Sequence, residues 1–148
     1  MKKKLLLMLV ALMAISTAAY AQGRKGLCIN EVMVQNDSSV VDDYGMRHGW
    51  IELTNSTHAS MEISSVYLTN DSTTPEKYYP VPLGDVNTNI PPLQQVIFWA
   101  DGEPNKGTFH TSFKIKPGET IYIIDADKKT VLDKVTIPSD LKPNTSFA

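Results

Sequence analysis

Apolar residues in this chain gather in short runs separated by turn-forming residues, and this spacing limits the folds open to it. Turn signals such as Asp101-Gly102 and Pro117-Gly118 recur roughly every ten residues. After the N-terminal apolar run, no stretch keeps the apolar period of an amphipathic helix. We therefore predict an all-β fold, a sandwich or a barrel, in one domain.

The clearest strand signal is Trp50-Ile51-Glu52-Leu53-Thr54-Asn55. Side chains alternate along a strand, so Ile51 and Leu53 should face the core and Trp50 the other side. The run 77–83 contains two prolines and fits only an edge strand. The run 27–34 alternates imperfectly, which a bulge or a two-sided edge position would explain. We expect about eight or nine strands, over residues 27–34, 49–54, 61–69, 77–83, 95–100, 109–115, 120–125, 130–137 and 145–147.

The N-terminus has the pattern of a secretory signal peptide. Lys2, Lys3 and Lys4 precede a short apolar run over 5–15, and the small-x-small triplet Ala19-Tyr20-Ala21 follows. The run is too short for a membrane span, which needs about 20 apolar residues. We predict a signal peptide over 1–21, cleaved before Gln22, a flexible leader over 22–26 and a domain over 27–148. The mature chain should be periplasmic or extracellular, without direct insertion into the membrane.

Charge argues against a nucleic-acid partner. The signal peptide holds three of the 14 basic residues and none of the 16 acidic ones, so the mature formal net charge is about −5. Nucleic-acid binding depends on clustered Lys and Arg, which this chain lacks. The lone Cys28 lies too far from the cleavage point to carry a lipid anchor. It packs as a small residue in a strand, or pairs with another chain.

Metal and catalytic motifs are weak, so we predict no metal, cofactor or catalytic residue. His48, His58 and His110 are scattered, and no pair of them has metal-ligand spacing. Two acidic turns leave calcium open as an alternative, Asp125-x-Asp127 and Asp42-Asp43 with Asp37.

Catalytic arrangements are equally incomplete. There is no Gly-x-Ser-x-Gly elbow, and Ser112 near His110 does not make a triad. Glu31 and Glu52 should sit side by side on neighbouring strands, where salt bridging or turn hydrogen bonding suits them better than acid–base work. We expect the chain not to be an enzyme.

Aromatic residues offer a glycan platform as a further alternative. Trp99 lies in the most apolar run and fits the core, whereas Tyr78 and Tyr79 are the better surface candidates, because their segment should be an edge. Asn-x-Ser/Thr triplets begin at Asn36, Asn55, Asn70 and Asn144, and we interpret these as turns. Asp71-Ser72-Thr73 resembles a bacterial O-glycan acceptor.

A series of short stretches carries a family pattern in a fixed order. They are Ile29-Asn30-Glu31-Val32, Trp50 to Asn55, Ile63 to Asp71, Ile90-Pro91-Pro92, Val96 to Gly102, His110 to Lys114, Gly118 to Asp125 and Val131 to Thr136. This series resembles lamin-tail domains of the exported bacterial type and covers nearly all the mature chain. The resemblance implies an immunoglobulin-like β-sandwich.

The departures from that pattern are local. The family usually has Gly-Trp at Ser65-Val66 and Asp-Gly at Asp127-Lys128. Its last strand continues past the position of Ala148, so the resemblance implies a domain truncated within that strand.

The resemblance implies a role in protein binding or as an accessory domain. We expect a non-enzymatic scaffold domain that binds another envelope protein through a sheet edge or a loop surface, its homo-oligomeric state being left open. Two alternatives remain: a periplasmic accessory domain of a membrane complex, such as a gamma-like subunit of a sodium-pumping decarboxylase, with its membrane span elsewhere; and a calcium- or glycan-binding surface module.

Export is the first testable prediction. The protein recovered from the envelope fraction should have the intact mass of residues 22–148, because cleavage follows Ala21. A chain that keeps residues 1–21 in that fraction contradicts the signal peptide.

Overall fold

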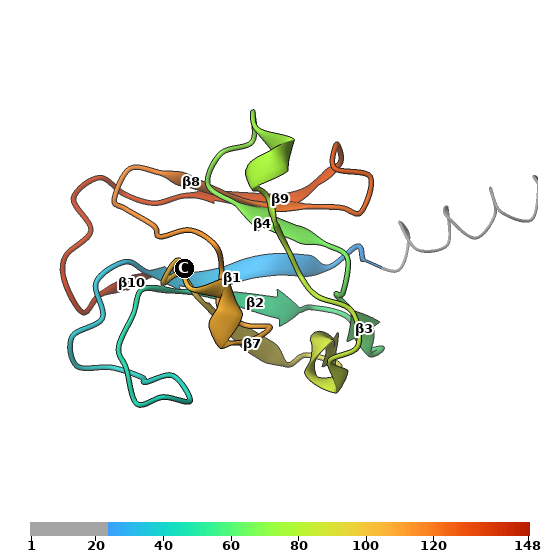
Figure 1. Ribbon diagram of the computed structural model, residues 1–148, viewed down its shortest axis with the longest axis horizontal. Helices are drawn as coiled ribbons and strands as arrows, with labels where there is room; N and C mark the ends of the chain where they lie inside the picture. Colours follow the sequence, from blue (N-terminus) through green and yellow to red (C-terminus); the bar gives the residue numbers. More distant parts are fainter. Residues whose placement is uncertain (1–23) are drawn as a thin grey trace, which may run out of the picture.

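The computed structural model describes residues 24–148, which form an all-β fold (Figure 1). The predicted signal peptide and the first two leader residues lie outside the described residues. Within 24–148, no helix is long and apolar enough to span a membrane. The strands are β1 (Leu27–Met33), β2 (Trp50–Asn55), β3 (Met61–Glu62), β4 (Tyr67–Thr69), β5 (Tyr79–Pro80), β6 (Asn89–Ile90), β7 (Gln95–Trp99), β8 (Thr120–Ile124), β9 (Val131–Thr136) and β10 (Ser146–Phe147).

Two four-stranded antiparallel sheets enclose the core. Their strand orders are β10-β1-β2-β7 and β5-β4-β8-β9, and β3 pairs with β6 in a small separate ladder. Figure 1 shows β4, β8 and β9 in one layer and β1, β2 and β7 in the other. In the described part of the chain, three single-turn 3-10 helices lie in the connections: Pro75–Lys77, Val86–Thr88 and Pro104–Lys106.

The predicted alternation of β2 is confirmed. Ile51 and Leu53 are fully buried and belong to the core shared by both sheets. Removing each such side chain from water contributes about 1.5–3 kcal/mol to stability. Trp50 points to the other side of the sheet, where it forms a second buried cluster with Met33 and Trp99.

The imperfect alternation of β1 comes from a bulge. The β1–β2 register shifts between Ile29 and Glu31, so Asn30 is the extra residue. Ile29 lies opposite Leu53 before the bulge, and Val32 lies opposite Ile51 after it. Ile29 and Val32 can therefore both face the core, although a regular strand would point them to opposite sides.

Three predicted strands differ from the structure. Residues 109–115 form no strand, and their backbone pairs with β7 and the segment after it only through the isolated bridges Trp99–His110 and Asp101–Lys114. The run 61–69 divides into β3 and β4 because Ser65, at φ +71°, turns the chain between them. The run 77–83 keeps only β5, at a sheet edge as its prolines require.

The end of the expected flexible leader is instead bound to the domain. Arg24 is only 6% exposed, and its guanidinium Nη1 lies 2.7 Å from Asp125 Oδ1 while Nη2 donates to the Ser64 carbonyl at 2.7 Å. Leu27 N–H donates to the Arg24 carbonyl, which closes a turn over residues 24–27. A buried arginine needs such partners because an unpaired buried charge is strongly unfavourable.

The left-handed backbone at Ser65 yields a stability prediction. Glycine adopts positive φ without the Cβ clash that serine has, so Ser65→Gly should raise the free energy of unfolding by about 0.5–1 kcal/mol. Chemical denaturation measures this change. Asn144→Gly is the matched control at φ +58°, because Asn144 Oδ1 accepts from the N–H groups of Asp37 and Ser38. That control should lose stability, and a loss in Ser65→Gly would contradict the strain.

Candidate functional site

The connection between β1 and β2, residues 34–49, is a long loop that we call the β1–β2 loop. It has no strand or helix of its own, so side chains hold its shape. Asn36 is 5% exposed, and its Nδ2 donates to the carbonyls of Val40 at 2.8 Å and His48 at 3.1 Å. These bonds tie the two ends of the loop together.

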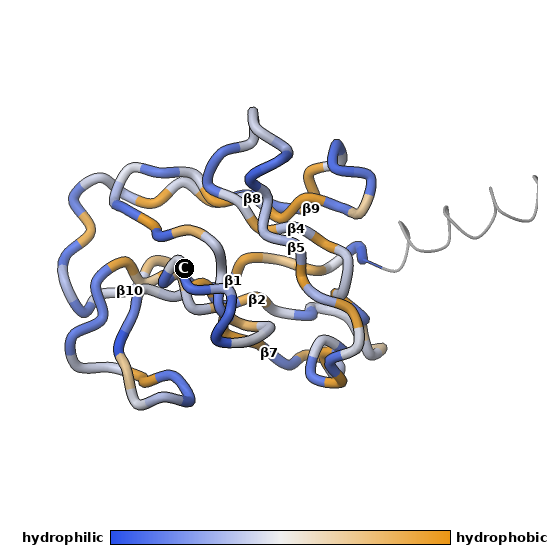
Figure 2. Tube along the Cα trace, in the orientation of Figure 1, coloured by the Kyte–Doolittle hydropathy of each residue, from blue (hydrophilic) through white to orange (hydrophobic). Residues whose placement is uncertain are grey.

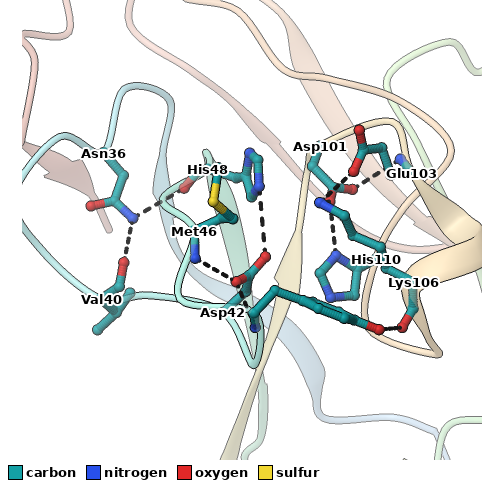
Figure 3. Close-up of polar contacts among 10 residues, drawn as sticks. Asn36, Val40, Asp42, Met46, His48, Asp101, Glu103, Lys106 and His110 are labelled. Carbon is teal, nitrogen blue, oxygen red and sulfur yellow. Dashed lines mark hydrogen bonds and ion pairs between the residues drawn. The ribbon is translucent and has the colours of Figure 1, made fainter.

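Asp42 organises the tip of the β1–β2 loop (Figure 3). Its side chain is fully buried, and Oδ1 accepts from the N–H groups of Tyr44 at 2.9 Å and Met46 at 2.7 Å. The Asp42 N–H also donates to the Met46 carbonyl. Gly45 takes the positive φ of +74° that this tight turn requires. The carboxylate is thus the cap of the turn, with only Oδ1 used in capping.

Asp101 faces this loop from the segment after β7. Its side chain is fully buried, Oδ1 accepts from the Glu103 N–H at 3.0 Å, and Oδ2 lies 2.8 Å from His110 Nδ1. Burial raises the pKa of Asp101, but the hydrogen bonds from His110 and Glu103 outweigh it and leave the pKa below its usual range. Asp101 is therefore a carboxylate at neutral pH.

Lys106 lies between the buried Asp101 carboxylate and the solvent. Its Nζ lies 3.6 Å from Asp101 Oδ2 and forms a closer ion pair with Glu103. The hydrogen bond to Glu103 raises the pKa of Lys106 above its usual value. Tyr44 connects this group to the loop, since its hydroxyl donates to the Lys106 carbonyl at 2.8 Å and its ring meets the edge of His110.

The side chains of Asp42, His48 and Asp101, which we call the Asp42 cluster, converge between these two segments. Each offers one atom able to bind a metal ion, and these atoms lie within 4.8 Å of one another. Within residues 24–148, three buried side-chain atoms have no hydrogen-bond partner: Asp42 Oδ2, His48 Nε2 and Trp50 Nε1. Two of the three belong to the Asp42 cluster.

A hollow of about 350 Å³ lies beside the Asp42 cluster. Its lining includes Tyr44 from the β1–β2 loop, Trp99 from β7, and Lys106 and His110 from the segment that follows. The hollow thus lies along β7, the last strand of the β10-β1-β2-β7 sheet, and its lining includes Val96, which packs against the core, and Trp99 of the outer cluster.

The structure does not assemble the predicted aromatic platform. Tyr78 and Tyr79 are 7% and 4% exposed, so their prediction as surface residues is wrong. Their hydroxyls donate to the carbonyls of Ser72 and Thr108, which lets both rings be buried with satisfied polar ends. Trp50 and Trp99 are also buried, in the cluster on the outer side of the sheet.

The predicted carboxylate pair forms, but its members have separate partners. Glu31 and Glu52 lie opposite one another across β1 and β2. Glu52 accepts from the Asn30 side chain at 2.7 Å, and Glu31 accepts from the Ser146 hydroxyl. Both carboxylates therefore take part in hydrogen bonds within the sheet.

In the acidic turns considered for calcium, the aspartates bond to other groups of the protein. Asp125 pairs with Arg24, and Asp127 accepts from the N–H groups of Lys129 and Thr130 and from the Thr130 hydroxyl. In the loop, Asp37 bonds to Gln35 and Asn144, and only Asp42 turns inward.

Sequence spacing alone misses the Asp42 cluster, but strand pairing would have found part of it. Trp50 pairs with Trp99 in the antiparallel β2–β7 ladder, and the Ala100 N–H extends that ladder to the Gly49 carbonyl. Continuing the same register puts His48 opposite Asp101. The loop then returns Asp42 to this end of the two strands.

Comparison with known proteins gives no relative. The chain matches no protein-family model, no curated protein and no solved structure.

Asp42 and Asp43 are adjacent carboxylates with opposite environments, which makes a matched pair for mutagenesis. Asp42→Ala removes the acceptor of two loop N–H groups and should cost about 1.5–3 kcal/mol of stability. Asp43→Ala changes an exposed residue and should stay within about 0.5 kcal/mol of the parent. Denaturant unfolding of both variants measures the difference, and equal losses would contradict the capping role of Asp42.

Proposed function

We propose that this chain is an exported, non-enzymatic domain that binds another envelope protein through the β1–β2 loop. The observation that carries the proposal is a group of four exposed apolar side chains in one stretch of that loop, residues 40–46. Their exposed fractions are 41% for Val40, 46% for Val41, 59% for Tyr44 and 52% for Met46. The loop projects from the two layers in Figure 1, and Figure 2 shows apolar residues along it.

Apolar residues gathered on one surface segment favour an interaction role. Single exposed apolar residues are ordinary, whereas several together mark contact surfaces. These lie on a backbone already fixed by Asn36 and Asp42. A fixed loop loses little conformational entropy on binding, so more of its contact energy contributes to affinity.

The sheet edges offer less to a partner than the loop does. β5 and β10 have two residues each, and β5 contains Pro80. β9 is longer, but Asp133 in β9 accepts from the Ile29 N–H at 2.8 Å, which ties that edge to β1. At the end of β7, Trp99 donates to Phe109 and accepts from Thr111 through its backbone.

The resemblance to lamin-tail domains supports the same assignment, because those domains act in binding. Two four-stranded antiparallel sheets around one core are consistent with the immunoglobulin-like sandwich that we propose with it. An accessory domain of a membrane complex, the alternative from sequence, would use the same kind of surface toward its partner subunit.

A loop variant tests the proposal. Val41→Ser with Met46→Ser removes two exposed apolar side chains and leaves the backbone groups bonded to Asp42 in place. The control is Leu83→Ser with Val86→Ser, two residues that are 78% and 84% exposed in a different connection.

Each protein carries a photo-crosslinking side chain in place of exposed Asp43 and serves as bait in an envelope extract. The captured partner is then purified and titrated against the parent, the control and the loop variant. The parent and the control should bind the purified partner equally, and the loop variant at least about tenfold more weakly, because buried apolar area is lost. Equal binding by all three proteins, or capture of no partner, overturns the proposal.

A further inference from the structure

We propose that Asp42, His48 and Asp101 form a binding site for one divalent transition cation of the zinc type. The inference goes beyond the proposed function, since a cation can bind here whether or not the β1–β2 loop contacts a partner. It rests on the convergence of three ligand atoms within 4.8 Å and on two buried atoms among them, Asp42 Oδ2 and His48 Nε2, that make no hydrogen bond.

The gap between Asp42 and His48 has the width of a coordination site. Asp42 Oδ2 lies 3.6 Å from His48 Nε2, an ion-pair distance that is too long for a hydrogen bond. Two ligands bound to one zinc ion at about 2.0–2.2 Å and at near-tetrahedral angles lie about 3.3–3.6 Å apart. Figure 3 shows the two side chains directed toward one another across this gap.

Hydrogen bonds hold the Asp42 carboxylate and the His48 backbone on the two sides of the gap. Asp42 is held through Oδ1 by two loop N–H groups, and the carbonyl of His48 is held by Asn36. Asp42 Oδ2 and His48 Nε2 make no hydrogen bond and face one another at the ion-pair distance of 3.6 Å. A buried carboxylate oxygen without a hydrogen bond is unfavourable, and a cation bound between Asp42 and His48 would compensate for this.

Asp101 completes the set from the opposite segment. Its orientation is fixed by the Glu103 N–H and by His110 Nδ1, a carboxylate–histidine contact of the kind that supports metal ligands. The neighbouring Lys106 ammonium, 3.6 Å from Asp101, opposes a cation. Its side chain is partly exposed and its closer partner is Glu103, so it can remain with Glu103 when the site fills.

The donor set selects the class of cation. One imidazole nitrogen and two carboxylate oxygens suit Zn²⁺, whereas Ca²⁺ and Mg²⁺ take mainly oxygen ligands and more of them. Three protein ligands also leave a coordination position open, so a bound cation would keep a water or accept a group from a partner.

Titration calorimetry of the tag-free protein with Zn²⁺, Ca²⁺ and Mg²⁺ tests the site. Asp42→Asn keeps an oxygen to cap the loop but removes the charge of the ligand, and His48→Gln removes the imidazole. His58→Gln is the matched control, because His58 is exposed and lies outside the Asp42 cluster. Circular dichroism checks that each variant is folded. If Asp42→Asn does not fold, the zinc affinity of His48→Gln alone tests the site.

The parent and His58→Gln should bind one Zn²⁺ per chain, more tightly than Ca²⁺ or Mg²⁺. Asp42→Asn and His48→Gln should each weaken that binding at least about tenfold. Zinc should also shift the ring resonances of His48 and leave those of His58 unchanged. Absence of Zn²⁺ binding, undiminished binding by the cluster variants, an equal loss in His58→Gln, or tighter Ca²⁺ or Mg²⁺ binding overturns the proposal.

Discussion

The structure depends on a strand that must bury both of its faces. Ile51 and Leu53 of β2 enter the core between the sheets, while Trp50 on the opposite face joins Met33 and Trp99. The outer face of an antiparallel sheet ordinarily meets water, so these large side chains require cover. Polar segments at the ends of β2 and β7 lie on that side, and they bring buried carboxylates with them.

Satisfied polar groups elsewhere show why the Asp42 cluster is unusual. Asn55 is fully buried, yet it donates to the carbonyls of Ala59 and Ile90 and accepts from Thr57. Arg24 and Asp125 are likewise paired. Against this background, Asp42 Oδ2 and His48 Nε2 are two of only three buried side-chain atoms in residues 24–148 without a hydrogen bond, and such departures often mark functional sites.

Strands were predictable where alternation and turn residues agree, and the site was not. The pattern around Ile51 and Leu53 is local, so a sequence reading places β2 within one residue of its bounds. Nothing local distinguishes Asp42 from Asp43, because burial of the first depends on a loop returning to the end of a strand pair. The prediction that Tyr78 and Tyr79 lie on the surface was wrong for the same reason. The carbonyls that accept hydrogen bonds from their hydroxyls lie in connections whose paths are set by tertiary structure.

The bonds around β1 determine when the domain can finish folding. Arg24 pairs with Asp125, Ile29 with Asp133 and Glu31 with Ser146, across separations of 101, 104 and 115 residues. Contacts this distant in sequence carry a large loop-closure entropy and form slowly. A ribosome must therefore release nearly the whole chain before the first strand gains all its partners, and until then the edge of β1 that faces away from β2 is open to pairing with other chains.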